Sequence, residues 1–64
     1  MVKINGENLD VAGQTVTEYL TGAGYDTKRV AVEKNGEIVP KSLYDKTVLS
    51  DGDMVEVVSF VGGG

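Results

Sequence analysis

The stretch MVKINGENLDVAGQTVTEYL, residues 1–20, contains the signals that decide the fold. Apolar and polar residues alternate ahead of Asn5-Gly6, and the alternation resumes beyond it with Leu9 and Val11. Asn-Gly between alternating segments is typical of a two-residue β-hairpin turn, because both turn positions need positive φ. The pattern therefore predicts a β-hairpin with one apolar face over residues 1–12.

A helix is predicted directly after this hairpin. Thr15 stands three residues before Glu18, the spacing of a capping box, in which each side chain bonds the backbone N–H of the other residue. The apolar residues that follow at helical spacing are Val16, Tyr19, Leu20 and Ala23. Glycines at 22 and 24 favour a stop, so we expect a helix over residues 16–23.

The rest of the chain predicts strands closing over that helix. In order, we expect a strand at 30–33, an Asn-Gly turn at 35–36, a short strand at 38–39 ended by Pro40, a helical turn at 42–46, a turn at 51–53 and a final, longest strand at 54–61. This order is that of the α+β, β-grasp fold, with a mixed four- to five-stranded sheet packed on one main helix. The domain would cover residues 1–61, followed by a flexible glycine tail at 62–64.

Composition restricts the chemistry of the chain. Its 64 residues include no Cys and no His. There is then no disulfide or zinc site of the usual kind, no thiol nucleophile and no imidazole base. A chain this short also leaves little room for a ligand pocket of roughly 300–1,000 Å³. We therefore expect a protein that is not an enzyme and that binds no metal.

Charge restricts the partners. The formal net charge is −4, which argues against nucleic acid and against an anionic membrane surface, since both attract Lys and Arg. No apolar run approaches the ~20 residues of a membrane span, and Met1 leads directly into a strand without a signal peptide. The chain is expected to be cytoplasmic.

The chain ends with Gly62, Gly63 and Gly64 directly after Val61. One interpretation is a frayed terminus, since chain ends are commonly disordered. The other is a presented group, because glycine lacks Cβ and can enter a narrow slot. Three residues extend about 10 Å, enough to place a terminal carboxylate inside a partner's active site. Adenylation would activate the Gly64 carboxylate toward a nucleophile, and if that nucleophile is a sulfur donor, the product is a thiocarboxylate.

The outward face of the last strand is a second candidate site. If Val55 and Val57 point to the core, the period of two sends Val58 and Phe60 to the other face, beside Val61. An exposed apolar patch on so small a protein suggests partner binding. The alternative is a slipped register in which Phe60 packs inward.

Acidic residues elsewhere are weaker candidates. Asp51-Gly52-Asp53 lacks the further oxygen ligands and distal Glu of a calcium loop, so a tight turn is favoured. Glu33, Glu37 and Asp45 are expected to be solvated surface residues.

The segment Arg29-Val30-Ala31-Val32-Glu33-Lys34-Asn35-Gly36-Glu37-Ile38-Val39-Pro40 closely resembles the ThiS family of thiamin-biosynthesis sulfur carriers. The opening Asn5-Gly6-Glu7 and the ending, from Asp51-Gly52-Asp53 to Gly62-Gly63-Gly64, match as well, so the resemblance covers essentially the whole chain. A departure occurs at residues 41–44, where the family often has a Trp and this chain has Tyr44 or its neighbour at that position; we expect it to affect partner fit at most.

The resemblance implies a ubiquitin-like fold and a defined set of partners. A ThiF-like adenylating enzyme, using ATP and magnesium, would activate Gly64, while this chain binds no cofactor itself. Sulfur from cysteine, through a cysteine desulfurase, would give the thiocarboxylate, which thiazole synthase (ThiG) would use. The first alternative is a sulfur carrier of another pathway, such as a molybdopterin-type carrier or one that transfers sulfur to an amino acid or metabolite. The others are a ubiquitin-like protein modifier and a structural interaction domain with an inert tail.

Overall fold

Two Asn-Gly turns organise the sheet. The computed structural model describes residues 1–60. Asn5 and Gly6 have φ of 50° and 85°, and Asn35 and Gly36 have φ of 52° and 83°. Both positions of each turn are thus in the left-handed region that a two-residue hairpin requires, and Asn and Gly tolerate it best. The first turn joins β1 (Val2–Ile4) to β2 (Glu7–Leu9), and the second joins β3 (Val30–Lys34) to β4 (Glu37–Val39).

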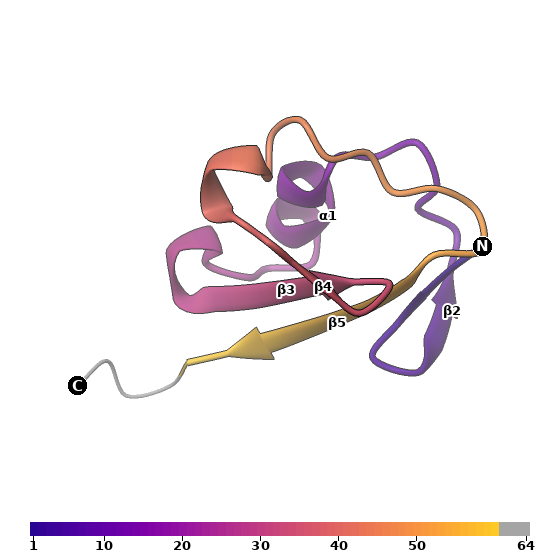
Figure 1. Cartoon of the computed structure of the whole chain (residues 1–64), viewed down its shortest axis with the longest axis horizontal. Helices are drawn as coiled ribbons and strands as arrows, with labels where there is room; N and C mark the ends of the chain where they lie inside the picture. The colour runs from indigo at the N-terminus through magenta and orange to yellow at the C-terminus, as the bar shows by residue number, and fades with distance from the viewer. Residues whose placement is uncertain (61–64) are drawn as a thin grey trace.

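The last strand, β5 (Met54–Ser59), lies in the middle of the sheet. The order of the five strands is β2-β1-β5-β3-β4. β5 runs parallel to β1 and antiparallel to β3, so the mixed sheet predicted from the sequence is confirmed. Figure 1 shows β5 crossing the molecule and ending at the side opposite the N-terminus.

One helix covers one face of this sheet. α1 (Val16–Gly22) begins at the predicted capping box: the Glu18 N–H donates to Thr15 Oγ1 at 3.1 Å, and the Thr15 N–H donates to Glu18 Oε1 at 2.8 Å. The helix packs over one face of the sheet, and no helix or strand within residues 1–60 covers the other face (Figure 1). Two short 3₁₀ helices, Thr27–Arg29 and Lys41–Leu43, connect the elements.

The core lies between α1 and the sheet. Its buried side chains come from every strand except β2, from α1 and from the segment between β4 and β5. They are Val2, Ile4, Val16, Leu20, Val30, Val32, Val39, Tyr44, Leu49, Val55 and Val57. No buried side-chain polar atom within residues 1–60 lacks a hydrogen-bond partner.

Several predictions from the sequence need correction. β2 ends at Leu9, so Val11 is not part of the return strand but packs against the core from a loop. α1 ends at Gly22, and Ala23 is its exposed C-cap residue, not part of the buried face. The helical turn predicted at 42–46 is the 3₁₀ helix Lys41–Leu43.

Tyr44 is part of the core. It is only 4% exposed, and its hydroxyl donates to the Val30 carbonyl oxygen at 3.4 Å. Burial raises its pKa above 10.0. A residue with so little surface belongs to the packing of the domain, and the expectation about partner fit stays a prediction.

Candidate functional site

The predicted reactive end of the chain, Gly62, Gly63 and Gly64, lies outside the described residues, as does Val61. The structure describes the element that leads to it. Ser59 at the end of β5 pairs with Val30, and the Phe60 N–H donates to the Arg29 carbonyl oxygen at 2.7 Å. The chain is therefore held by sheet hydrogen bonds as far as Phe60.

The side chains of the two turn asparagines fix β5 in place. Asn5 Oδ1 accepts from the Val57 N–H at 2.8 Å, and Asn5 Nδ2 donates to the Val57 carbonyl oxygen at 3.1 Å. Asn5 thus satisfies both backbone groups of Val57 beyond the short β1–β5 ladder. Asn35 Oδ1 accepts from the Met54 N–H at 2.9 Å on the other side of β5. Sequence reasoning identified both residues only as turn formers and missed this contact, because nothing in a local pattern shows which distant strand a side chain reaches.

Asp53 anchors the start of β5. Burial alone would raise the pKa of this carboxyl, but three contacts outweigh it and hold the pKa below its ordinary value of 3.8. Asn35 Nδ2 donates to Oδ1 at 3.0 Å, and the Ser50 N–H donates to Oδ2 at 2.8 Å. The Lys34 ammonium lies 3.8 Å from Oδ2. Asp51-Gly52-Asp53 is a tight turn, as favoured from the sequence, with Gly52 at φ 88°.

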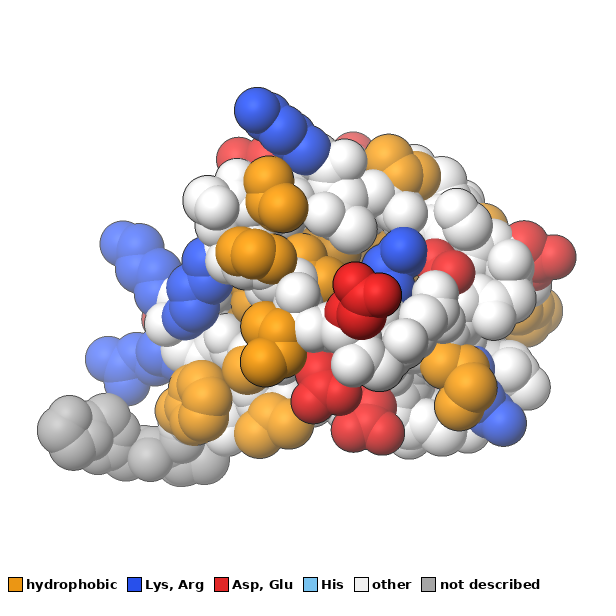
Figure 2. Space-filling model, in the orientation of Figure 1, with side chains coloured by type: hydrophobic (Ala, Val, Ile, Leu, Met, Phe, Trp, Pro, Cys, Tyr) orange, Lys and Arg blue, Asp and Glu red, His pale blue; other side chains and the backbone are white. Residues whose placement is uncertain are grey.

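Two of the three predicted docking residues, Val58 and Phe60, lie on the face of the sheet opposite α1, which we call the open face. Val55 and Val57 are buried, whereas Val58 is 55% exposed and Phe60 is 58% exposed. This confirms the predicted register and excludes the alternative in which Phe60 packs inward. Ala31 pairs with Val58 on the same face, and Ile38, 76% exposed, follows on β4. In Figure 2 hydrophobic side chains gather at the lower left of the molecule, where β5 ends, with acidic side chains beside them.

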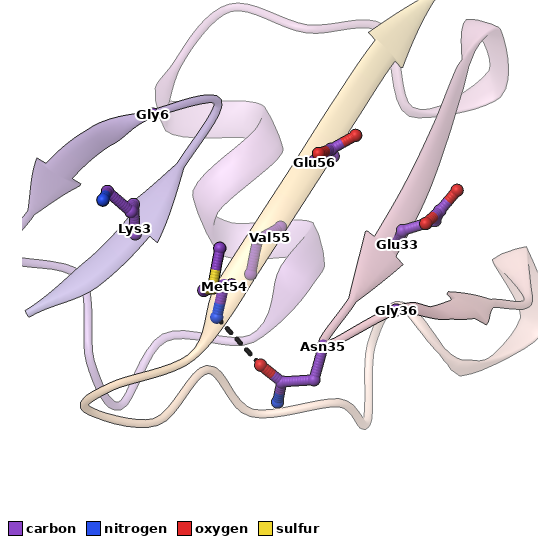
Figure 3. A pocket seen from close by; sticks show the side chains of 8 residues that line it. All are labelled: Lys3, Gly6, Glu33, Asn35, Gly36, Met54, Val55 and Glu56. Carbon is purple, nitrogen blue, oxygen red and sulfur yellow. Dashed lines mark hydrogen bonds between the residues drawn. The ribbon is translucent and has the colours of Figure 1, made fainter.

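The open face also contains a hollow of about 570 Å³. Figure 3 shows that Lys3, Met54, Glu56 and Glu33 line it from three neighbouring strands, with α1 behind the sheet. The volume of this hollow falls in the range of ligand pockets, but the hollow is not an enclosed pocket. The hollow lies open on the sheet surface and has no cover among residues 1–60.

The described part of the chain holds no group of three or more His, Cys, Asp or Glu side chains arranged to bind a metal ion. Among the helices of residues 1–60, none is long and apolar enough to cross a membrane. Glu33 and Glu37 are exposed, and the exposed Asp45 accepts from Thr17 Oγ1 at 2.5 Å.

Comparison with known proteins identifies relatives along the whole chain. The ThiS family model matches residues 2–64. The sulfur carrier protein ThiS of Bacillus subtilis (strain 168) is 38% identical over 66 residues, covering 100% of both chains. The sulfur carrier protein ThiS of Thermus thermophilus is 41% identical over 64 residues, again covering 100% of both. These relatives are named as carriers and not as enzymes, in agreement with the sequence prediction.

Other relatives are much longer. A thiazole synthase of Paramagnetospirillum magneticum is 48% identical over 62 residues, which are 95% of this chain and 19% of that protein. The chain thus spans about a fifth of the length of this relative. Among solved structures, a thiamine biosynthesis protein (ThiS) from Geobacter metallireducens superposes with a TM-score of 0.77 at 37% identity, covering 98% of this chain and 97% of that one. The β-grasp arrangement predicted from the element order is thereby confirmed.

Proposed function

The chain belongs to the ThiS family, and from that premise we propose that it is a sulfur carrier of thiamin biosynthesis, with the sulfur carried on the Gly64 carboxyl group. The observation that carries the proposal is the match to named sulfur carrier proteins over the full length of both chains. The absence of any Cys from the sequence agrees with it, because the sulfur must then be held at the chain end and not on a thiol.

The proposed chemistry needs two steps at one carboxyl group, that of Gly64. A Gly64 carboxylate oxygen attacks the α-phosphorus of ATP, and pyrophosphate leaves with its electron pair. The carbonyl carbon of the resulting acyl-adenylate then accepts a sulfur nucleophile, and AMP leaves. Where the nucleophile is a persulfide, the adduct is an acyl disulfide. A second thiol then attacks the donor's sulfur in the S–S bond, so that the donor ends in a disulfide and Gly64 leaves as a thiocarboxylate. ATP and magnesium serve the adenylating enzyme, and this chain binds neither as a resident cofactor.

The described residues supply docking and presentation. The exposed side chains of Val58 and Phe60, together with Val61, would bind the partner's surface, while Gly62 and Gly63 offer no side chain to obstruct entry of Gly64. The strand that precedes them is central in the sheet and is held from both sides. A rigid domain followed by residues without side chains suits a carrier whose C-terminus must enter the active sites of several enzymes.

Three partners follow from this role. A ThiF-like enzyme would adenylate Gly64, a cysteine desulfurase would supply the sulfur, and a thiazole synthase would consume the thiocarboxylate. The thiazole synthase is the partner with the strongest support, because proteins of that name contain a segment 48% or 41% identical to this chain.

Deletion of Gly64 tests the proposal. The adenylating enzyme from the same organism should catalyse ATP–pyrophosphate exchange with the full chain and not with the chain lacking Gly64, because the deletion moves the carboxylate back by about 3.4 Å. Urea unfolding of both proteins is the control, and it should be unchanged because the core lies within residues 2–57. Exchange at the full rate with the deleted chain would refute adenylation at Gly64.

A further inference from the structure

The sequence contains the dipeptide Asn-Gly twice, at residues 5–6 and 35–36. Asparagine is among the chemically labile residues, and a following glycine increases the lability because it has no side chain to shield its backbone nitrogen. In both dipeptides the asparagine amide is hydrogen-bonded to β5 or to the residue before it. Reaction requires the amide carbon to approach the glycine nitrogen, so these bonds must open before either site can react.

The two amides differ in how firmly they are held. Asn5 binds both backbone groups of Val57, which lies within β5 and is only 7% exposed, and the two bonds are partly buried. Asn35 binds Asp53 and Met54 at the start of β5, where Met54 is 62% exposed and both bonds are open to solvent. Bonds at an exposed end of an element open at a lower free-energy cost than bonds in its interior. The amide of Asn35 should therefore be released more often than that of Asn5.

The contact between Asn35 and Asp53 depends on the amide group. Asn35 Nδ2 donates to Asp53 Oδ1 at 3.0 Å. Deamidation replaces this NH2 group by an oxygen, and an ionised carboxylate accepts hydrogen bonds but donates none. Two carboxylates would then face each other, with the Lys34 ammonium, 3.8 Å from Asp53 Oδ2, as the cation beside them. One ammonium group offsets only part of the repulsion, because it already pairs with Asp53.

We propose that Asn35 is a site of spontaneous deamidation, which reacts ahead of Asn5, and that its product loosens the start of β5 by setting a second carboxylate against Asp53. This inference does not depend on the proposed function. The modification acts at one end of β5, and the same strand leads at its other end to the C-terminal glycines of the sequence. The chain therefore carries a chemical limit on the lifetime of its central strand.

The reaction needs no reactant except water. The Gly36 nitrogen gives up its proton and attacks Cγ of Asn35, which forms a five-membered cyclic imide. The Cγ–Nδ2 bond breaks, and Nδ2 leaves with that proton as ammonia. Water then adds to one of the two carbonyl carbons of the ring and opens it. Opening at Cγ gives an aspartate in the ordinary chain, and opening at the main-chain carbonyl carbon gives an isoaspartate; both add one negative charge.

Timed incubation of the full chain at mildly alkaline pH tests the order of the two sites. Peptide mapping by mass spectrometry measures each site separately, and the chain unfolded in urea supplies the reference rates. Dividing the folded rate by the unfolded rate removes the intrinsic effect of the preceding residues, Ile4 and Lys34. This ratio should be about tenfold higher at Asn35 than at Asn5. Equal ratios, or a higher ratio at Asn5, would overturn the inference.

A charge swap tests the consequence of the reaction. Asn35→Asp carries the new charge on an ordinary backbone and should melt about 4–8 °C below the wild type at neutral pH. Adding Asp53→Asn is the matched control, because it restores one carboxylate and one amide with their places exchanged. The double variant should therefore melt at a higher temperature than Asn35→Asp alone. A double variant that melts at or below the temperature of Asn35→Asp would refute the repulsion between the two carboxylates.

Lowering the pH provides a second readout of the same pair. Two facing carboxylates raise the pKa of one of them, so Asn35→Asp is destabilised at neutral pH and regains stability as the pH falls through that raised value. The protonated carboxyl can then donate to its neighbour as the Asn35 amide does. The difference in melting temperature from the wild type should shrink between about pH 6 and pH 4. A difference that stays constant or grows over this range would contradict the proposed pair.

Discussion

Asn5 and Asn35 each perform two tasks that only an asparagine combines well. Each adopts a positive φ of about 50°, which β-branched and bulky residues avoid. Each also uses its amide to bond the backbone of β5, at Val57 and at Met54 respectively. The strand that presents the proposed reactive end is therefore positioned by the same two residues that make the hairpins turn.

Asn5→Gly should separate these two tasks. Glycine keeps the positive φ but loses both bonds to Val57, so the free energy of unfolding should fall by about 1–3 kcal/mol. Asn5→Ala should lower the free energy of unfolding by a further ~1–2 kcal/mol, because the left-handed backbone conformation is unfavourable for alanine. Urea unfolding measures both changes. If Asn5→Gly is as stable as the wild type, the amide contacts contribute nothing to the position of β5.

Asp53 should make stability depend on pH in the acid range. Its folded pKa is held below 3.8, so the unfolded chain binds more protons there and stability rises with pH. The contribution is fully present above 3.8 and is lost as the pH falls through the folded pKa. Asp53→Asn should flatten the pH dependence of the urea midpoint between about pH 2 and 5. Asp10→Asn, at an exposed loop position, is the control, and equal slopes for Asp53→Asn and the wild type would contradict this account.

At the scale of elements, the features predicted from neighbouring residues in the sequence are confirmed. Both hairpins, the capping box and the break at Pro40 depend on residues adjacent in the chain, and all are present in the structure. The register of β5 was also predictable, because the alternation of valines leaves only one arrangement that buries Val55 and Val57.

Elements that depend on distant contacts were harder to predict. Leu49 is 1% exposed although it lies in an irregular segment without periodicity. Its N–H donates to the Gln14 carbonyl oxygen at 2.8 Å, and its carbonyl oxygen accepts from the Gly13 N–H at 2.8 Å. This segment is held against the loop before α1 by backbone bonds, which no side-chain pattern reveals. Val11 was misplaced for the same reason.

The capping box should contribute measurably to α1, a helix of only 7 residues. Thr15→Ala removes the acceptor of the Glu18 N–H and should lower the free energy of unfolding by about 0.5–2 kcal/mol. Thr21→Ala makes the same chemical change at an exposed position of α1 and should be neutral or slightly stabilising. Thermal unfolding of the two variants measures the stability that each one loses. Equal losses in both would show that the cap has no special role.

At the scale of the whole molecule, the candidate site was predicted in part. The exposure of Val58 and Phe60 followed from the strand period and is confirmed. The hollow beside them was missed, because it depends on Lys3, Glu33 and Glu56 meeting from three strands. Their proximity is a property of the strand order, and β1 meets β5 across about fifty residues of intervening chain.

The arrangement of the molecule fits the proposed carrier function. Helix and core occupy one side of the sheet, so the open face remains free for a partner (Figures 1 and 3). β5 lies between β1 and β3 and leads to the C-terminal glycines of the sequence. In the proposed function, docking on the exposed side chains of β5 is separated along the chain from the reaction at Gly64.

Mass spectrometry of the C-terminal peptide tests the central claim most directly. The chain is incubated with the adenylating enzyme, ATP, magnesium, a cysteine desulfurase and cysteine, and its C-terminal fragment is then analysed. Our account predicts that one oxygen is replaced by one sulfur at Gly64, and that omission of ATP abolishes the exchange. An unchanged Gly64 in the complete mixture, or Gly-Gly remnants on lysines of target proteins in cells, would contradict a sulfur carrier.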